Sequence, residues 1–283
     1  MNPALKLSSR ETGQFWPIPV LFEDDQLLAL DKPSDLPLTP DLGSPNQPSM
    51  MSLVHRDIEN GATWAKARNI TFLANANRIG AETTGVLLLA KTKEAFTNLA
   101  DQFGSEKPYK DYLALVHGTP GKESYRVELK ISTSSDPSGR FHPNLQLGKK
   151  AITLIESVEQ YSGYALVRCR PLTNRPHQIR IHLSRKRLPV VGDSLYGGHP
   201  LRLSTLKPHY RLRGGKSEKP LIGRIALHSE AIHFLHPVTG ESLSITAPQP
   251  RDFLVALKYL HRYAPALQPM DFDPFPSEPH SEA

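Results

Sequence analysis

Residues 77–85, Asn-Arg-Ile-Gly-Ala-Glu-Thr-Thr-Gly, place a guanidinium, a carboxylate and two hydroxyl groups directly before the apolar run of residues 86–90. Two glycines followed by Lys91 could be taken for a phosphate-binding loop, but the G-K-[ST] sequence that such a loop requires is absent. Thr83 and Thr84 are better placed to satisfy the backbone of a turn than to act as nucleophiles. A polar turn that leads into a buried strand is therefore the first candidate site.

A second polar segment, residues 171–182, contains two histidines and two arginines. We expect residues 179–183 to form a strand. His177 and His182 lie five residues apart, which would place them on opposite faces of such a strand and argues against a metal site. The single cysteine, Cys169, has no internal disulfide partner, and no Cys/His spacing suits zinc. We expect neither a metal nor a cofactor.

Basic residues exceed acidic ones by six, which favours a polyanionic partner without identifying it. Cations cluster between residues 198 and 224, where only Glu218 opposes them, and a shorter group precedes this segment. Clustering matters because several cations must meet one phosphate backbone together. The alternative is a solvated basic loop. The candidate phosphate-binding residues are Arg185, Lys186, Arg187, Arg202, Lys207, Arg211, Arg213 and Lys216.

The elements that must position these segments are mostly strands. Helices are expected over residues 51–67, with Ser52 as a possible cap, and over residues 93–103, with Gly104 as a stop. Strands broken by a few helices, without regular β-α-β alternation, indicate a mixed α+β domain. Strands are expected within residues 20–33 (two, around an acidic turn) and at residues 86–90, 112–116, 151–156, 165–170, 179–183 and 225–232.

The chain has no run of 18 apolar residues and no basic-then-apolar amino terminus, so we expect neither a membrane span nor a signal peptide. These features and the lone cysteine point to a cytoplasmic location. The last twenty residues contain five prolines and four acidic residues, and we expect this tail to be disordered because it cannot bury enough apolar surface.

Six segments of the chain, in order, are similar to motifs of the RluA-type RNA pseudouridine synthases. Residues 77–85 resemble the family's H-R-L-D-x-x-T-S-G, residues 110–118 resemble K-x-Y-L-A-L-V-x-G, and residues 171–182 resemble P-x-T-G-R-T-H-Q-I-R-V-H. Residues 189–197 resemble P-I-V-G-D-P-L-Y-G, and residues 224–237 hold the closing R-L-A-L-H and H-P segments. Ordered matches across residues 20–253 are far more specific than one motif.

The resemblance implies the pseudouridine synthase fold, an α+β domain whose largely antiparallel sheet and flanking helices form a central RNA-binding cleft. In the family, a uridine flipped from RNA loses its glycosidic bond, and the uracil turns and rejoins the ribose through carbon. Carried over by position, Tyr112 is the ring beside the base, Arg180 the guanidinium that orients a carboxylate, and Leu227 part of the pocket wall. The resemblance also implies substrate contacts from Arg78, Thr83, Arg175, His177 and Gln178.

The position of the family's nucleophilic aspartate holds Gly80 in this chain. Glycine offers no carboxylate, and losing a central nucleophile removes several orders of magnitude of rate. Glu82 and Asp111 are the candidate substitutes, although Asp111 should face away from Tyr112 because adjacent strand side chains alternate. The other departures are milder: Asn77 for His, Ile79 for Leu, Asn174 for Gly and Pro176 for Thr.

Without that aspartate, Arg180 would be a buried cation lacking a partner, which costs roughly 3–5 kcal/mol. We expect Glu82, a small anion with water, or an RNA phosphate to occupy the vacated space.

Residues 1–17 are interpreted as an amino-terminal extension, residues 18–262 as the catalytic domain without an S4-type RNA-binding module, and residues 263–283 as the disordered tail. Two functions remain open. The chain either binds ribosomal or transfer RNA, as a monomer, with isomerisation lost or strongly reduced, or isomerises uridine with a substitute carboxylate such as Glu82. A glycosidase using water in place of the carboxylate is a remote third.

Overall fold

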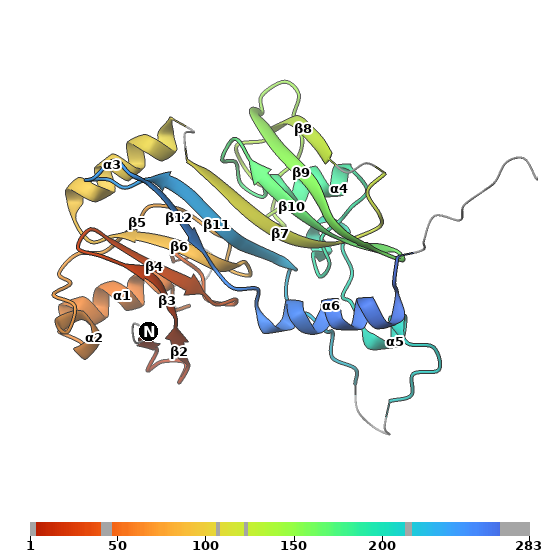
Figure 1. Cartoon of the computed structure of the whole chain (residues 1–283), viewed down its shortest axis with the longest axis horizontal. Coiled ribbons are helices and arrows are strands. Elements are labelled where there is room, and N and C mark those ends of the chain that lie inside the picture. Colours follow the sequence, from red (N-terminus) through yellow and green to blue (C-terminus); the bar gives the residue numbers. More distant parts are fainter. Residues whose placement is uncertain (1–3, 41–46, 106–107, 122–123, 213–216, 267–283) are drawn as a thin grey trace, which may run out of the picture.

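The computed structural model describes residues 4–40, 47–105, 108–121, 124–212 and 217–266. Its main feature is a ten-stranded sheet in the order β3-β4-β6-β11-β7-β10-β9-β8, with β5 added to β6 and β12 added to β11. All neighbouring strands of this sheet are antiparallel except β6 and β11. With the helices that flank the sheet (Figure 1), this confirms the predicted α+β class.

The strands are β1 (Leu5–Ser8), β2 (Phe15–Ile18), β3 (Val20–Glu23), β4 (Leu27–Lys32), β5 (Ala74–Asn75), β6 (Thr84–Ala90), β7 (Tyr109–His117), β8 (Ser124–Ile131), β9 (Lys149–Tyr161), β10 (Tyr164–Pro171), β11 (Leu227–Leu235) and β12 (Ser242–Thr246). The helices are α1 (Met50–Glu59), α2 (Thr63–Lys66), α3 (Lys93–Gly104), α4 (Gln178–Arg185), α5 (Leu203–Leu206) and α6 (Arg251–Tyr263), with a short 3-10 turn at Ser194–Tyr196.

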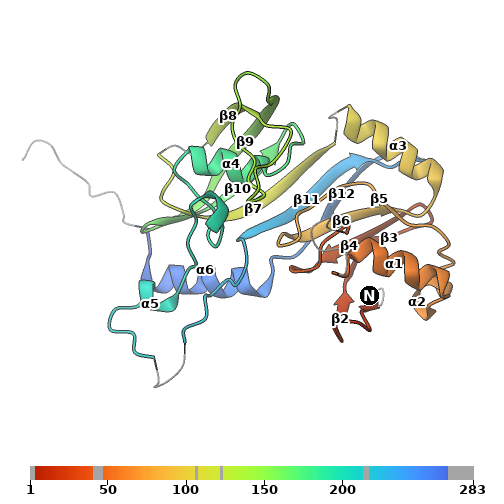
Figure 2. The ribbon, with the colours of Figure 1, turned by 180° about the vertical axis from the view of Figure 1, so that it is seen from behind.

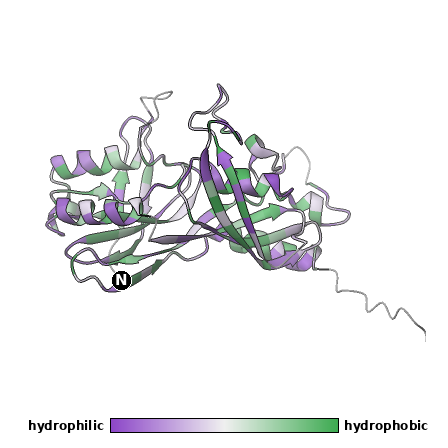
Figure 3. Ribbon diagram, turned by 90° about the horizontal axis from the view of Figure 1, so that it is seen from above, coloured by the Kyte–Doolittle hydropathy of each residue, from purple (hydrophilic) through white to green (hydrophobic). Residues whose placement is uncertain are grey.

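The half of the sheet around β4 and β6 is covered on both faces. Alternate residues of β6 divide between two cores: Leu87 and Leu89 belong to the core that includes Met50 and Val54 of α1, and Val86 and Leu88 to the core that includes residues of α3. Alternation on a pleated strand sends successive side chains to opposite faces, so a strand covered twice must be apolar throughout. This explains the uninterrupted apolar run of the sequence. Figure 3 shows the resulting division of hydrophobic and hydrophilic residues over the helices and strands.

The other half, around β8, β9 and β10, lies beside α4, and Figure 2 shows this helix in front of these strands when the molecule is seen from behind. On β8 the burial pattern alternates, with Val127 and Ile131 inside and charged residues outside. A strand with one solvated face is expected to alternate in this way. One face of this half-sheet is therefore open to solvent.

Helix α4 corrects the sequence prediction, which placed a strand over residues 179–183. Its buried residues include Gln178 and His182, one helical turn apart, as well as the apolar residues at 179, 181 and 183. Polar residues inside the core removed the helical period from the hydropathy pattern and left an apparent alternation. Helix α1 also differs from the prediction: Ser49 is the cap, and Ser52 closes a capping box with it.

Two flanking elements pack onto the main core. The hairpin of β1 and β2 buries Leu5, Leu7 and Ile18 there, so most of the predicted amino-terminal extension is an ordered hairpin. Helix α6 adds Phe253 and Leu260 to the same core. The predicted disordered tail lies, apart from residues 263–266, outside the described residues.

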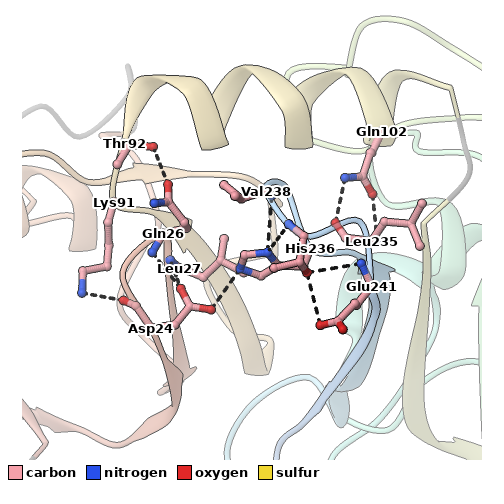
Figure 4. A network of polar contacts seen from close by, with 11 residues as sticks. Asp24, Gln26, Leu27, Lys91, Thr92, Gln102, Leu235, His236, Val238 and Glu241 are labelled. Atoms are coloured by element: carbon pink, nitrogen blue, oxygen red, sulfur yellow. Dashed lines mark hydrogen bonds and ion pairs between the residues drawn. The ribbon is translucent and has the colours of Figure 1, made fainter.

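A polar network fixes the outer corner where the turn between β3 and β4 meets α3 and the turn between β11 and β12 (Figure 4). The Nδ1 atom of His236 accepts hydrogen bonds from two backbone amides of the next turn, so its Nε2–H donates to Asp24 Oδ2 at 3.1 Å. Lys91 donates to the Asp24 carbonyl, and the Gln102 amide exchanges two hydrogen bonds with the backbone of Leu235. His236, the histidine of the closing H-P segment, therefore stabilises this corner of the fold and lies away from the candidate site.

Candidate active site

A cavity of about 590 Å³ brings the separated sequence segments together. It lies between the turn that precedes β6, the strand β7, the start of β11 and the amino-terminal end of α4. All nine residues predicted to be catalytic or substrate-binding line it, namely Gly80, Tyr112, Arg180, Arg78, Thr83, Leu227, Arg175, His177 and Gln178. The sequence motifs therefore converge on one concave site.

Two buried cations hold the turn that carries Gly80. Lys32, which is fully buried, donates from Nζ to the carbonyls of Ala81 at 2.8 Å and Thr83 at 3.2 Å. Arg224 donates from Nη1 to the intervening Glu82 carbonyl at 3.4 Å. Burial lowers the pKa of Lys32 to about 7. Three consecutive carbonyls are thus fixed from inside the protein, and the side chains of the turn are left to face the cavity.

The turn leads into β6 at the point where that strand pairs in parallel with β11. Gly85 has φ of +107°, and a Cβ atom there would lie 2.1 Å from the carbonyl oxygen of Ser229. Only glycine allows this approach, because any side chain would overlap the neighbouring backbone. Beside it, Thr84 Oγ1 and His228 Nδ1 are hydrogen-bonded at 2.9 Å. The last glycine of the motif therefore sets the distance between the two strands that frame the site.

Gly80 itself is not required by its backbone. It has no positive φ, and a Cβ added to it would meet only Thr83 Oγ1, at 3.3 Å. A contact of that length needs the hydroxyl to move by a few tenths of an ångström, and a threonine hydroxyl on a turn can do so by rotation. The position therefore has room for a Cβ atom, and it borders the cavity into which a longer side chain could extend.

Arg180 has a partner that the sequence prediction missed. Its Nε and Nη2 atoms donate to the two carboxylate oxygens of Asp193, each at 2.6 Å, and the Asp193 side chain is fully buried. The guanidinium also lies 4.8 Å from the ring of Tyr196. The expectation that Glu82, a small anion or an RNA phosphate replaces the partner of Arg180 is therefore wrong. Asp193 lies in the G-D segment of the fourth motif, which is the sequence signal that could have identified it.

The loop before α4 is held by a buried amide. Gln178 donates from Nε2 to the Ile152 carbonyl and to Thr153 Oγ1, each at 2.9 Å. Its Oε1 accepts from Thr173 Oγ1 and from the Arg175 amide. Both ends of the side chain are thus occupied, so Gln178 positions the loop although it also lines the cavity.

His177 adopts a left-handed backbone with φ of 51° at the cap of α4. Its Nδ1 atom is hydrogen-bonded to the Tyr196 hydroxyl at 2.9 Å. Burial, aided by the positive charge of Arg180, lowers the pKa of His177 to about 4. The ring is therefore neutral at physiological pH. With α4 a helix, the argument that His177 and His182 face opposite sides of a strand no longer applies.

The two candidate substitute carboxylates lie on different sides of β7. Glu82 lines the cavity, and burial raises its pKa although Arg180 opposes the shift. Asp111 faces the other way, as predicted, and forms a bidentate ion pair with Arg170 at 2.8 and 2.9 Å. Of the two, only Glu82 can reach a substrate in this cavity.

Lys110 is a site residue that the sequence analysis did not select. It lines the cavity with Tyr112, two residues further along the same face of β7. Burial raises the pKa of Tyr112 to about 12 and lowers that of Lys110 to about 8. The phenol is therefore neutral and the amine largely charged at neutral pH. The lysine of the K-x-Y motif was the signal that could have identified it.

The predicted basic residues do not line this cavity. Those that are described, at 185–187, 202, 207 and 211, are solvent-exposed, and Arg213 and Lys216 lie outside the described residues. Figures 1 and 2 both place the segment around α5 beyond α6, well below α4. The two basic groups are therefore on separate parts of the surface.

Within the residues that the structure describes, no cluster of three or more His, Cys, Asp or Glu side chains is arranged to hold a metal ion. None of the helices in the described ranges is long and apolar enough to cross a membrane.

Comparison with known proteins places these features in a family. Residues 26–185 match the family model described as RNA pseudouridylate synthase. The chain is 33% identical over 260 residues to "Ribosomal large subunit pseudouridine synthase D" of Xanthomonas campestris, covering 88% of this chain and 71% of that protein. It is 32% identical over 251 residues to the protein of the same name from Xylella fastidiosa, covering 86% and 70%.

Among solved structures, the fold is similar to that of "Human RNA Pseudouridylate Synthase Domain Containing 4", with a TM-score of 0.63 and 21% identity over 86% of this chain and 92% of the human one. "Human RNA Pseudouridylate Synthase Domain Containing 1" gives a TM-score of 0.58 and 20% identity, covering 82% of this chain and 84% of that one. At these identities the likeness supports the fold assignment.

Proposed function

Because the chain belongs to the RluA-type family of RNA pseudouridine synthases, we propose that it binds structured RNA, ribosomal or transfer, and has lost or strongly reduced uridine isomerisation. One observation carries the proposal: Gly80, which the sequence resemblance aligns with the family's nucleophilic aspartate, lines the same cavity as Tyr112, Arg180 and Leu227. A hydrogen atom at that position can neither attack the ribose nor stabilise charge on it.

The remaining charges support binding. Four cations, Arg78, Lys110, Arg175 and Arg180, line the cavity, and Glu82 is the one carboxylate among its described lining residues. Arg180 is neutralised by Asp193, but the balance stays positive. A concave surface with excess positive charge attracts a phosphodiester backbone.

The second candidate is an active synthase in which Glu82 replaces the missing aspartate. It is favoured by the place of Glu82 in the cavity, where this solvent-exposed residue is accessible to a substrate. Glu82 lies two positions after Gly80 in the same turn, however, so its carboxylate starts from a different backbone position.

One series of variants tests both candidates. The natural protein, Gly80→Asp, Gly80→Asn and Glu82→Gln would each be supplied to a strain lacking the gene, and pseudouridines would be mapped in its ribosomal and transfer RNA. We expect no modification by the natural protein and recovered modification by Gly80→Asp, because the position accepts a side chain. Gly80→Asn is the matched control, since it has nearly the same shape without the charge.

Modification that depends on the natural protein and disappears in Glu82→Gln would establish the second candidate in place of the first. RNA binding is measured separately, by fluorescence anisotropy with rRNA and tRNA fragments at moderate salt. Absence of binding by the natural protein would refute the proposed RNA-binding function.

A further inference from the structure

Lys110 is a buried cation without a counter-charge in the described part of the chain. Its residue surface is 7% exposed, and no hydrogen bond or ion pair to its Nζ atom is formed by any described residue. The centroid of the Phe103 ring lies 5.5 Å from Nζ. Burial alone lowers its pKa, with no contribution from a nearby carboxylate.

A buried charge of this kind is costly unless something pairs with it. The neighbouring cations of the site show the contrast, because Lys32 donates to three carbonyls and Arg180 is paired with Asp193. Lys110 differs from both in that its amine faces open space. Because no described group of the protein offsets the cost of burying this charge, we expect the Lys110 amine to bind a ligand.

The open space is a small annex of the main cavity. It measures about 140 Å³, and its polar lining residues are Asn77, Arg78, Lys110, Thr173 and Asn174. This is several times the volume of one water molecule and accommodates a tetrahedral anion. Its described lining residues include two cations and no carboxylate. Arg78 and Lys110 also line the main cavity, so the two spaces share a cationic wall.

We propose that Lys110, together with Arg78, binds a backbone phosphate of the RNA whose nucleotide base occupies the main cavity beside Tyr112. Lys110 and Tyr112 are separated by about 7 Å along one face of β7. A base against the ring and its phosphate against the amine therefore fit within one nucleotide. The proposal rests on the RNA binding proposed above and adds the residue that holds the substrate's charge.

The test uses Lys110→Met in the full-length protein, with binding of a fluorescein-labelled rRNA hairpin measured by anisotropy over a series of salt concentrations. Each phosphate contact contributes about 0.7–0.9 to the slope of log K against log salt. We expect Lys110→Met to lower that slope by about this amount and to weaken binding about tenfold at low salt. Lys110→Arg, which keeps the charge, should restore most of the slope.

Lys93→Met is the matched control, because it removes the same charge from an exposed lysine at the start of α3 that lines neither space. It should leave the slope unchanged. Thermal unfolding checks that each variant is folded. If the natural protein binds and Lys110→Met binds with the same slope and affinity, the phosphate contact is refuted while RNA binding stands. If the natural protein does not bind, both proposals fail.

Discussion

The two faces of the central strand β7 carry similar residues. They differ in whether the charged side chain has a partner of opposite charge among the described residues. On the reverse face, Asp111 is held by both donors of Arg170, and the Arg170 guanidinium lies 4.2 Å from the ring of Tyr109. On the cavity face, Lys110 has no such partner and Tyr112 borders open space. Both faces of β7 thus combine a tyrosine and a cation, but only on the reverse face does β7 itself also supply a carboxylate, that of Asp111.

The difference separates groups that stabilise the fold from groups that are available to a ligand. An ion pair with both members satisfied has no capacity left for a substrate, whereas an unpaired cation beside an aromatic ring retains it. The cavity face also contains one fully satisfied pair, Arg180 with Asp193. This pair should matter for stability first and for binding only indirectly.

The largest expected effect comes from breaking that pair. Asp193→Asn removes the charge of a fully buried carboxylate and leaves Arg180 buried with a neutral partner. Breaking a buried pair by removing one member costs roughly 3–5 kcal/mol, and we expect a loss of this size in the free energy of unfolding measured in urea.

The double variant Arg180→Met with Asp193→Leu is the control, since it removes both charges together. It should be less destabilised than Asp193→Asn alone, because no uncompensated charge remains. A loss below about 1 kcal/mol for Asp193→Asn would mean that water screens the pair and that its burial has no energetic weight.

A smaller effect with a distinct pH dependence is expected for Lys110. Its pKa falls from 10.5 to about 8 on folding, so between these values the unfolded chain binds more protons than the folded one. The contribution of Lys110 to stability therefore rises with pH across that window, by up to roughly 3 kcal/mol, and is constant below it. Lys110→Met should be more stable than the natural protein at pH 7, and the difference should shrink toward pH 10.5.

Urea unfolding at pH 7, 8, 9 and 10 measures this dependence. Lys93→Met, which replaces an exposed lysine, should follow the natural protein at every pH. If the difference between Lys110→Met and the natural protein were the same at all four values, the amine would not be titrating in this range, and its burial would be electrostatically unimportant. Gain of stability with loss of RNA binding would be the expected signature of a residue kept for binding.

The sequence predicts a helix or strand correctly where the buried positions of that element hold apolar residues. Strand β6 and helix α3 were predicted nearly to the residue because their buried positions are almost all aliphatic and regularly spaced. Helix α4 was predicted as a strand because its core-facing positions include Gln178 and His182. These polar side chains are buried by tertiary packing, and a local hydropathy pattern cannot predict that burial.

The site divides in the same way. Motif positions predicted which residues would line the cavity, since the spacing of a family pattern carries that information. They did not predict that Asp193 would hold Arg180 or that no described residue would pair with the Lys110 amine. Both depend on distances between segments far apart in the chain. Pairing of charges is a property of the folded arrangement, so it had to come from the structure.

The smallest effect is expected on the reverse face. Arg170→Met removes a cation whose side chain is 40% exposed, and Asp111 keeps His233 at 3.4 Å. Partly exposed pairs contribute about 1 kcal/mol or less. The Asp111 side chain is only 8% exposed, but His233 remains beside it, so the loss of unfolding free energy should stay well below that of Asp193→Asn. The net charge changes by the same amount as in Lys110→Met, yet the salt dependence of RNA binding should not change, because Arg170 lies across the sheet from the cavity. Anisotropy with the same labelled hairpin compares the two variants directly. An equal reduction in slope for both would show that RNA responds to total charge alone, and the contrast between the two faces of β7 would then have no bearing on binding.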